Sequence, residues 1–134
     1  MNEAIVVLDA SVGVKWFRDE AGSIEAADLL RLHASREIRL AVPVVFLHEV
    51  LDVARRTGGV GSARRVLDAL SRDEILVIGA DAEFLHHALD MCERLDCTVN
   101  DAAAPALAEL LGARLVSADR RAHGAFPGVR IIGN

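Results

Sequence analysis

The 134-residue sequence predicts an α/β fold, a three-layer α/β/α sandwich around a mostly parallel sheet of four to five strands. Short aliphatic runs rich in β-branched residues recur along the chain, and stretches with helical spacing of apolar residues separate them. The first run, AIVVL at 4–8, lacks polar alternation, as expected for a strand buried on both faces. Strands separated by helices pair in parallel, with the helices covering the sheet.

The elements can be placed from periodicity and from their stop signals. Strands are expected at 4–8, 39–42, 75–78 and 114–117, with a short fifth at 129–132. Helices are expected at 11–17, 23–33, 44–56, 62–70, 82–95 and 101–111. The apolar stripe of the second helix would be Ile24, Ala27, Leu30 and Ala34, and that of the third Phe46, Leu47, Val50, Leu51 and Ala54. Pro43 ends the second strand, Thr57-Gly58-Gly59 stops the third helix, and Gly112 stops the last.

Composition bounds the class of protein. The chain is 52% hydrophobic but only 4% aromatic, which indicates one aliphatic domain over residues 1–134. No apolar run approaches the roughly 20 residues that a membrane span needs, and Asp9 follows the first run too closely for a signal peptide. Cys92 and Cys97 match no zinc or redox spacing. These features predict a cytoplasmic protein with reduced cysteines.

The net charge of −5 does not decide whether the partner is a nucleic acid. All basic residues except Lys15 are arginines, the better bidentate phosphate ligands, and several occur in pairs such as Arg120-Arg121. Such pairs are also common on solvated helix faces. A cation held by acidic residues would lower the negative charge without repelling RNA.

Four acidic residues lie at or near the predicted carboxyl ends of strands. Asp9 follows the first strand, Glu49 lies in the helix after the second, Asp101 opens a helix, and Asp119 follows the fourth strand. Ligand sites of open α/β sheets form at this edge. Carboxylates and water are the ligands that Mg²⁺ and Mn²⁺ prefer, so the set predicts a divalent-metal site.

Each acid also has a structural alternative. Asp9, Asp101 and Asp119 stand at loop-to-helix junctions, where aspartate is a favoured N-cap. Glu49 lies away from the apolar stripe of its helix and could be a solvated surface residue. The metal-site hypothesis therefore depends on the four acids jointly.

Other catalytic classes fit less well. The segment His48-Glu49-Val50-Leu51-Asp52 lacks the second histidine of a zinc-protease helix, and the five histidines show no ligand spacing. A phosphoaspartate enzyme would want a second aspartate at position 11 and a late lysine, whereas the only lysine is Lys15. The glycines at 58–61 follow a helix instead of a strand, unlike a phosphate-binding loop.

Three segments together resemble the PIN-domain ribonucleases, and in particular the VapC toxins of VapBC toxin–antitoxin systems. They are VVLDASVGVKWFRDE, PVVFLHEVLDVARR and TVNDAAAPALAELLGARLVSAD, within a similarity that runs from Val6 to about Ile132. The resemblance implies a Mg²⁺- or Mn²⁺-dependent endoribonuclease, the toxin of a type II pair, that forms a homodimer and is inhibited by a cognate VapB-like antitoxin.

Carried over by position, the resemblance implies site residues as well. The catalytic acids would be Asp9, Glu49, Asp101 and Asp119, with Asp9, Asp101 and Asp119 as metal ligands. Ser11 and Ser117 match hydroxyls that would have a supporting role.

The sequence departs from the family pattern at three positions. Asn100 stands where many relatives have an aromatic residue, and Asp52 replaces a common asparagine, adding a carboxylate three residues after Glu49. Pro105 removes a backbone donor early in the helix that Asp101 opens; a delayed helix start would shift Asp101.

Two alternatives remain open at this stage. One is a PIN-like domain that binds RNA or a protein partner without cleaving RNA. The other concerns Trp16 and Phe17, which either pack in the core or face a groove for an antitoxin helix or a second subunit.

Overall fold

Five parallel strands form one sheet in the order β3-β2-β1-β4-β5 in the computed structural model, which describes residues 4–133. The strands are β1 (Ala4–Leu8), β2 (Ile38–Pro43), β3 (Leu76–Ile78), β4 (Arg114–Ser117) and β5 (Arg130–Ile131). Strands β1 and β4, which are followed by the predicted site residues Asp9 and Asp119, are neighbours in the sheet. Strand β2 lies on the other side of β1. The predicted α/β class and five-stranded sheet are confirmed.

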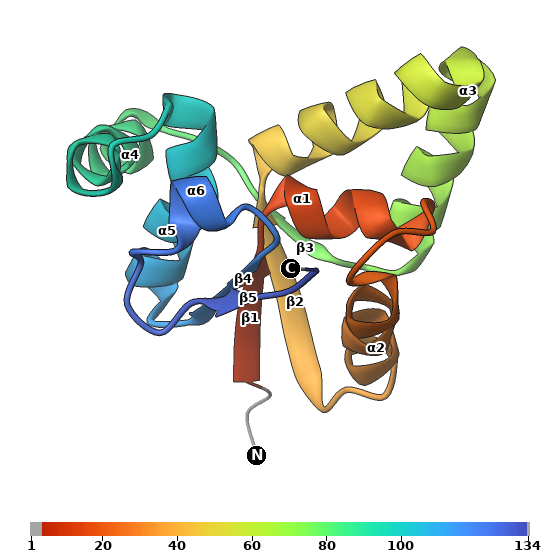
Figure 1. Ribbon diagram of the computed structural model, residues 1–134, viewed down its shortest axis with the longest axis horizontal. Helices are drawn as coiled ribbons and strands as arrows, with labels where there is room; N and C mark the ends of the chain where they lie inside the picture. The colour runs from red at the N-terminus through yellow and green to blue at the C-terminus, as the bar shows by residue number, and fades with distance from the viewer. Residues whose placement is uncertain (1–3, 134) are drawn as a thin grey trace.

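Helices cover both faces of this sheet. The helical elements are α1 (Ala10–Gly13), the 3₁₀ turn η1 (Val14–Trp16), α2 (Ser23–Ala34), α3 (Val44–Arg72), α4 (Ala82–Leu95), α5 (Val99–Leu111) and α6 (Arg120–His123). Figure 1 shows α1, α2 and α3 on one side of the strands and α4, α5 and α6 on the other. Between residues 4 and 133, no helix is long and apolar enough to cross a membrane.

Two hydrophobic cores lie on the two faces of the sheet. Successive residues of β1 point into different cores: Leu8 belongs to the core under α1, α2 and α3, and Val7 to the core under α4 and α5. Both side chains have no exposed surface, which accounts for the unbroken aliphatic run in the sequence. On the second face, the seven residues of α5 from Ala102 to Ala108 are all buried, and five of them are alanines that allow close approach to the strands.

The predicted helix stop at Thr57-Gly58-Gly59 is a break within α3. Gly59 has φ 82° and ψ 177°, a conformation that side chains disfavour and that interrupts the helix. The chain resumes helical geometry immediately afterwards, and Figure 1 shows the second half of α3 folding back toward the sheet. The helix predicted at 62–70 is this second half.

The predicted apolar stripe of α2 is wrong except at Leu30, which packs against the core. Ile24 is 84% exposed, and the buried residues are Ala26, Leu29 and His33. Polar contacts set this rotation of the helix: Leu40 N donates to His33 Nδ1 at 3.1 Å, and Trp16 Nε1 donates to Ala26 O at 2.9 Å. A buried imidazole with backbone partners on another element cannot be found from hydrophobic periodicity.

A tight contact between α1 and α3 supports a first prediction. An added Cβ on Gly13 would lie 2.5 Å from Phe46 Cζ and 3.0 Å from Val50 Cγ2. Gly13→Ala should therefore lower the free energy of unfolding. Overpacking should cost about 1–3 kcal/mol, and the higher helix propensity of alanine should offset up to about 1 kcal/mol of that cost. Urea denaturation measures this change. Gly79→Ala is the matched control because its Cβ would meet nothing within 4 Å, and an equal loss in both variants would contradict the argument.

Candidate active site

The four predicted acids come from elements that meet at the carboxyl edge of the sheet. Asp9 directly follows β1, and Asp119 is the second residue after β4. Glu49 lies in the second turn of α3, which starts directly after β2, and Asp101 lies in the first turn of α5. Helix α5 contacts β1, β2 and β4, which brings its acid to the ends of the central strands. All four residues are partly buried.

Asp9 is the N-cap of α1. Its Oδ2 accepts a hydrogen bond from Ser11 N at 2.9 Å, and its own N–H donates to Val116 O on β4 at 3.1 Å. The carboxylate has a second oxygen, Oδ1, which lies 4.0 Å from His123 Nε2. Capping and metal binding are therefore compatible for this residue, since they use different oxygens.

Asp119 is arranged in the same way at the start of α6. Its Oδ1 accepts from Ala122 N at 3.1 Å, and its N–H donates to Ser117 Oγ at 3.0 Å. These two bonds orient the carboxylate and leave Oδ2 as its second acceptor.

Asp101 is not an N-cap. Thr98 caps α5, and its Oγ1 accepts from Asp101 N at 3.2 Å. The helix begins at Val99, two residues before the predicted start, so Pro105 does not delay it. Thr98 followed three residues later by an acid is a capping-box spacing, a signal that could have placed this start. The first turn of α5 stabilises the negative charge of the Asp101 carboxylate, because backbone N–H groups at a helix N-terminus favour negative charge.

Glu49 shows the electrostatic character of the site. Its pKa is raised from 4.5 to about 7, mainly because the carboxyl group is half-buried and secondarily because of the charges of Asp9 and Asp101. Asp9, Glu49 and Asp101 thus interact across three elements, and Glu49 is not the solvated residue that its helix alone allowed.

The two predicted supporting serines join the turns that carry Asp9 and Asp119. Ser11 Oγ accepts from Ala118 N at 2.9 Å and lies 3.4 Å from Ser117 Oγ. Ser117 has no exposed surface. These contacts hold the turn after β1 against the end of β4 and fit a supporting role for both hydroxyls.

Sequence reasoning missed His123. Its side chain has no exposed surface and connects Ser117 with the backbone of Asp101. His123 fits no metal-ligand spacing, and its bond to Asp101 O joins residues 22 apart in sequence. Pro105 was the signal in the sequence, because a proline in a helix has no N–H to donate to the carbonyl four residues earlier. That carbonyl, of Asp101, then needs another hydrogen-bond donor.

A pocket of about 240 Å³ opens beside two of the acids. Asp96, Cys97, Thr98, Asp101, Asp119, Arg121 and Ala122 line it. Burial raises the pKa of the Cys97 thiol to about 11, with smaller contributions from Cys92 and nearby acids, so the thiol is protonated at neutral pH. Asp52, the additional acid of α3, is exposed and pairs with Arg55 and Arg56 on its own helix.

The donor set suits a hard divalent cation. Within residues 4–133, no three acidic, histidine or cysteine side chains lie close enough together to hold a metal in this conformation. The four acids nevertheless offer carboxylate oxygens. The pKa of Glu49 is raised first by burial and second by the charges of Asp9 and Asp101, and a cation would offset those charges. The residue types and the electrostatics fit Mg²⁺ or Mn²⁺.

Known proteins resemble the chain in both sequence and structure. The family model described as PIN domain matches residues 6–126, while the search of curated proteins found no match. Among solved structures, the chain is similar to VapC20 of Mycobacterium tuberculosis, described as a sarcin–ricin-loop-cleaving toxin, with TM-score 0.75, 18% identity, and 95% of this chain and 98% of that chain covered.

Two complexes are also similar to the chain in structure. One is a toxin–antitoxin complex from Klebsiella pneumoniae, with TM-score 0.73, 18% identity, and 92% and 94% of the two chains covered. The other is DNA-bound VapBC from Salmonella typhimurium, with TM-score 0.71, 18% identity, and 98% and 97% covered. At these identities the likeness establishes a shared fold.

The raised pKa of Glu49 leads to a pH-dependent prediction for the metal-free protein. As the pH rises from 4.5 through 7, the Glu49 carboxyl keeps its proton longer in the folded state than in the unfolded state. The free energy of unfolding of the wild type therefore falls over this range. Glu49→Gln should therefore be more stable than the wild type at pH 8, by about 1–2 kcal/mol after allowance for solvent screening, and nearly equal to it at pH 4.5.

Chemical denaturation in EDTA at the two pH values measures this difference. Glu93→Gln removes the same group from an exposed position on α4 and controls for the loss of one charge. A Glu49→Gln variant that is destabilised equally at both pH values would show that ionisation of Glu49 does not strain the fold.

Proposed function

The chain belongs to the PIN-domain family, whose model covers residues 6–126, and on this premise we propose that it is a divalent-metal-dependent endoribonuclease. We further propose that it acts in the cytoplasm as the toxin of a type II toxin–antitoxin pair. The observation that carries the nuclease proposal is the convergence of Asp9, Glu49, Asp101 and Asp119, from four separate elements, at one edge of the sheet.

In this mechanism the aspartates and Glu49 have different roles. Asp9, Asp101 and Asp119 would hold Mg²⁺ or Mn²⁺ through carboxylate oxygens. When bound, the cation supplies Lewis-acid catalysis and neutralises charge that develops on a phosphodiester. Glu49 either completes the ligand set or accepts the proton of the attacking water, and a pKa of about 7 suits a general base at neutral pH.

Arginine beside the acids fits a polyanionic substrate. Arg121 lines the pocket that Asp101 and Asp119 share, and both Arg120 and Arg121 are exposed. A guanidinium in this place would contact the phosphate backbone next to the scissile bond and offset the overall negative charge of the chain.

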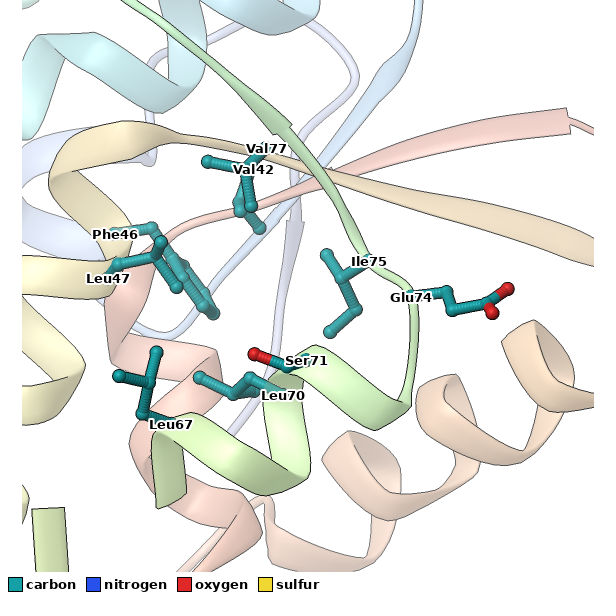
Figure 2. Close-up of a pocket in the computed structure, with 9 residues that line it drawn as sticks. All are labelled: Val42, Phe46, Leu47, Leu67, Leu70, Ser71, Glu74, Ile75 and Val77. Carbon is teal, nitrogen blue, oxygen red and sulfur yellow. The ribbon is translucent and has the colours of Figure 1, made fainter. Parts of the chain in front are cut away.

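A VapB-like antitoxin is the proposed protein partner, as in the toxin–antitoxin complexes that share the fold. An apolar pocket of about 320 Å³ lies between the two halves of α3 and strand β3. Figure 2 shows Phe46, Leu47 and Leu70 turned toward this pocket and the carboxylate of Glu74 turned away. An apolar segment of the antitoxin would fill it, and a basic antitoxin side chain would neutralise the acids.

Trp16 lies behind this surface. Its ring is partly buried against the core and its centroid is 6.0 Å from that of Phe46, which lines the pocket. Trp16 therefore packs as a core residue, and any effect on antitoxin binding would pass through Phe46.

A homodimer is proposed through the outer face of α4 and the start of α5. Leu85, Leu89 and Val99 are 44%, 52% and 44% exposed, and a small pocket beside them is lined by Phe84 and Ala88. Exposed leucines on an amphipathic helix that already buries its opposite face indicate a second interface.

The nuclease proposal predicts metal-dependent cleavage of pooled cellular RNA by the purified protein. Cleavage should require Mg²⁺ or Mn²⁺, stop in EDTA, and fall at least about 100-fold in Asp9→Asn and Asp101→Asn, because loss of a ligand carboxylate weakens charge neutralisation in the transition state. Asp52→Asn is the matched control, since that aspartate is exposed and paired with Arg55 and Arg56.

The alternative function makes a different prediction in the same assay. A PIN-like domain that only binds RNA or protein would retain RNA in a gel-shift assay without cutting it, with or without metal. Equal cleavage by the wild type and by Asp9→Asn would instead point to a contaminating nuclease.

The dimer proposal predicts that Leu89→Asp shifts the protein from dimer to monomer in size-exclusion chromatography with light scattering. A buried charge at the centre of an apolar interface is costly, so the shift should be complete at micromolar concentration. Ile24→Asp is the control because Ile24 is 84% exposed on α2, on the opposite side of the sheet. A monomeric wild type would exclude this interface.

A further inference from the structure

Pro105 creates a local problem in the helix that carries Asp101. In an α-helix, the carbonyl of residue 101 accepts from the N–H of residue 105, and proline has no N–H. The following residues of α5 are buried, so water is a poor substitute for the missing donor. The Asp101 carbonyl therefore needs a partner from elsewhere in the chain.

The imidazole of His123 supplies this partner. His123 Nε2 lies 2.6 Å from Asp101 O, and because a carbonyl oxygen only accepts, Nε2 carries the proton and donates it. The side chain is fully buried, which keeps water from competing for the bond. Residue 123 thus replaces the donor that residue 105 lacks.

The other ring nitrogen connects the imidazole to the turns of Asp9 and Asp119. His123 Nδ1 lies 2.6 Å from Ser117 Oγ, and in the neutral ring it accepts the serine proton. Ser117 Oγ in turn accepts from Asp119 N at 3.0 Å and lies 3.4 Å from Ser11 Oγ. Ser11 also donates its backbone N–H to Asp9 Oδ2. One buried ring thereby contacts, directly or through serines, the segments that bear three acids.

We propose that His123 is a positioning residue of the metal site, which holds Asp101 against Asp9 and Asp119 because Pro105 leaves the Asp101 carbonyl without its helical donor. This inference rests on the proposed metal-dependent function. With Pro105 present, the Asp101 carbonyl is bonded by the imidazole instead of by an N–H of its own helix. Its place then depends on the turns that carry the other two aspartates.

The pairing makes a prediction that a merely structural histidine does not. Removing the imidazole leaves the Asp101 carbonyl without a protein donor only while residue 105 is proline. With alanine at 105, the helix supplies its own N–H. The effect of a His123 substitution on metal binding should therefore depend strongly on residue 105.

The experiment is a calorimetric Mn²⁺ titration of the full chain in four forms: wild type, His123→Phe, Pro105→Ala and the double variant. His123→Phe should weaken Mn²⁺ binding about 10–100-fold, the range for groups that orient metal ligands. Pro105→Ala should bind within about threefold of the wild type, and the double variant should regain most of the loss. Urea denaturation of each form reports the folded state independently of activity.

Two further variants separate position from packing. His33→Phe is the matched control: His33 is also buried with two hydrogen-bonded ring nitrogens, but its partners, Leu40 N and the Asp73 carbonyl, lie outside the proposed site. It should reduce stability and leave Mn²⁺ affinity unchanged. His123→Gln retains an amide donor and should keep most of the affinity, and it decides the question if phenylalanine prevents folding.

The outcomes distinguish the inference from the proposed function. Wild-type protein that binds no Mn²⁺ would overturn the metal-dependent function and with it the role of His123. Wild-type protein that binds Mn²⁺, with His123→Phe binding equally well, or with a loss that Pro105→Ala leaves unchanged, would overturn the inference alone. If His123→Gln lost as much Mn²⁺ affinity as His123→Phe, that result would also contradict the proposed role of His123.

Discussion

The placing of partly buried carboxylates at one edge of a parallel sheet is the constraint on which the rest of the site depends. The half-buried Glu49 carboxyl, with the charges of Asp9 and Asp101 nearby, has its pKa raised to about 7. Such a cluster keeps its arrangement only if the surrounding backbone is rigid. Here backbone N–H groups donate to the carboxylates of Asp9 and Asp119, and a buried network of serine and imidazole side chains packs behind them.

The site lies at the seam between the two cores. Glu49 projects from α3, which packs on one face of the sheet, and Asp101 from α5, which packs on the other. Asp9 and Asp119 leave the sheet itself, at the ends of β1 and β4. A displacement in either core would therefore change distances between the acids. The bond from His123 to Asp101 O connects two of these segments, because it ties the first turn of α5 to α6, the helix that Asp119 caps.

Local patterns in the sequence predicted the strands and the four acids because each depends on residues close together in the chain. AIVVL reads as a buried strand from its own composition, and parallel topology then brings the acids to one edge. The rotation of α2 could not be predicted, because it depends on His33 finding partners at Leu40 and Asp73. His123 was missed for the same reason. Pro105 was recognised as a lost donor, but the compensating donor lies 22 residues from the carbonyl it serves.

The same partly buried carboxylates would connect three events. A proton on Glu49, a divalent cation among the aspartates and a basic side chain of the proposed antitoxin would each reduce the negative charge of one small region. Each of the three would therefore compete with the other two. In the metal-free protein at neutral pH, Glu49 is near half-protonation, and the cluster already carries part of the neutralisation that a cation would provide. Inhibition by a basic antitoxin residue would then need no distortion of the fold, because it would replace one source of positive charge with another.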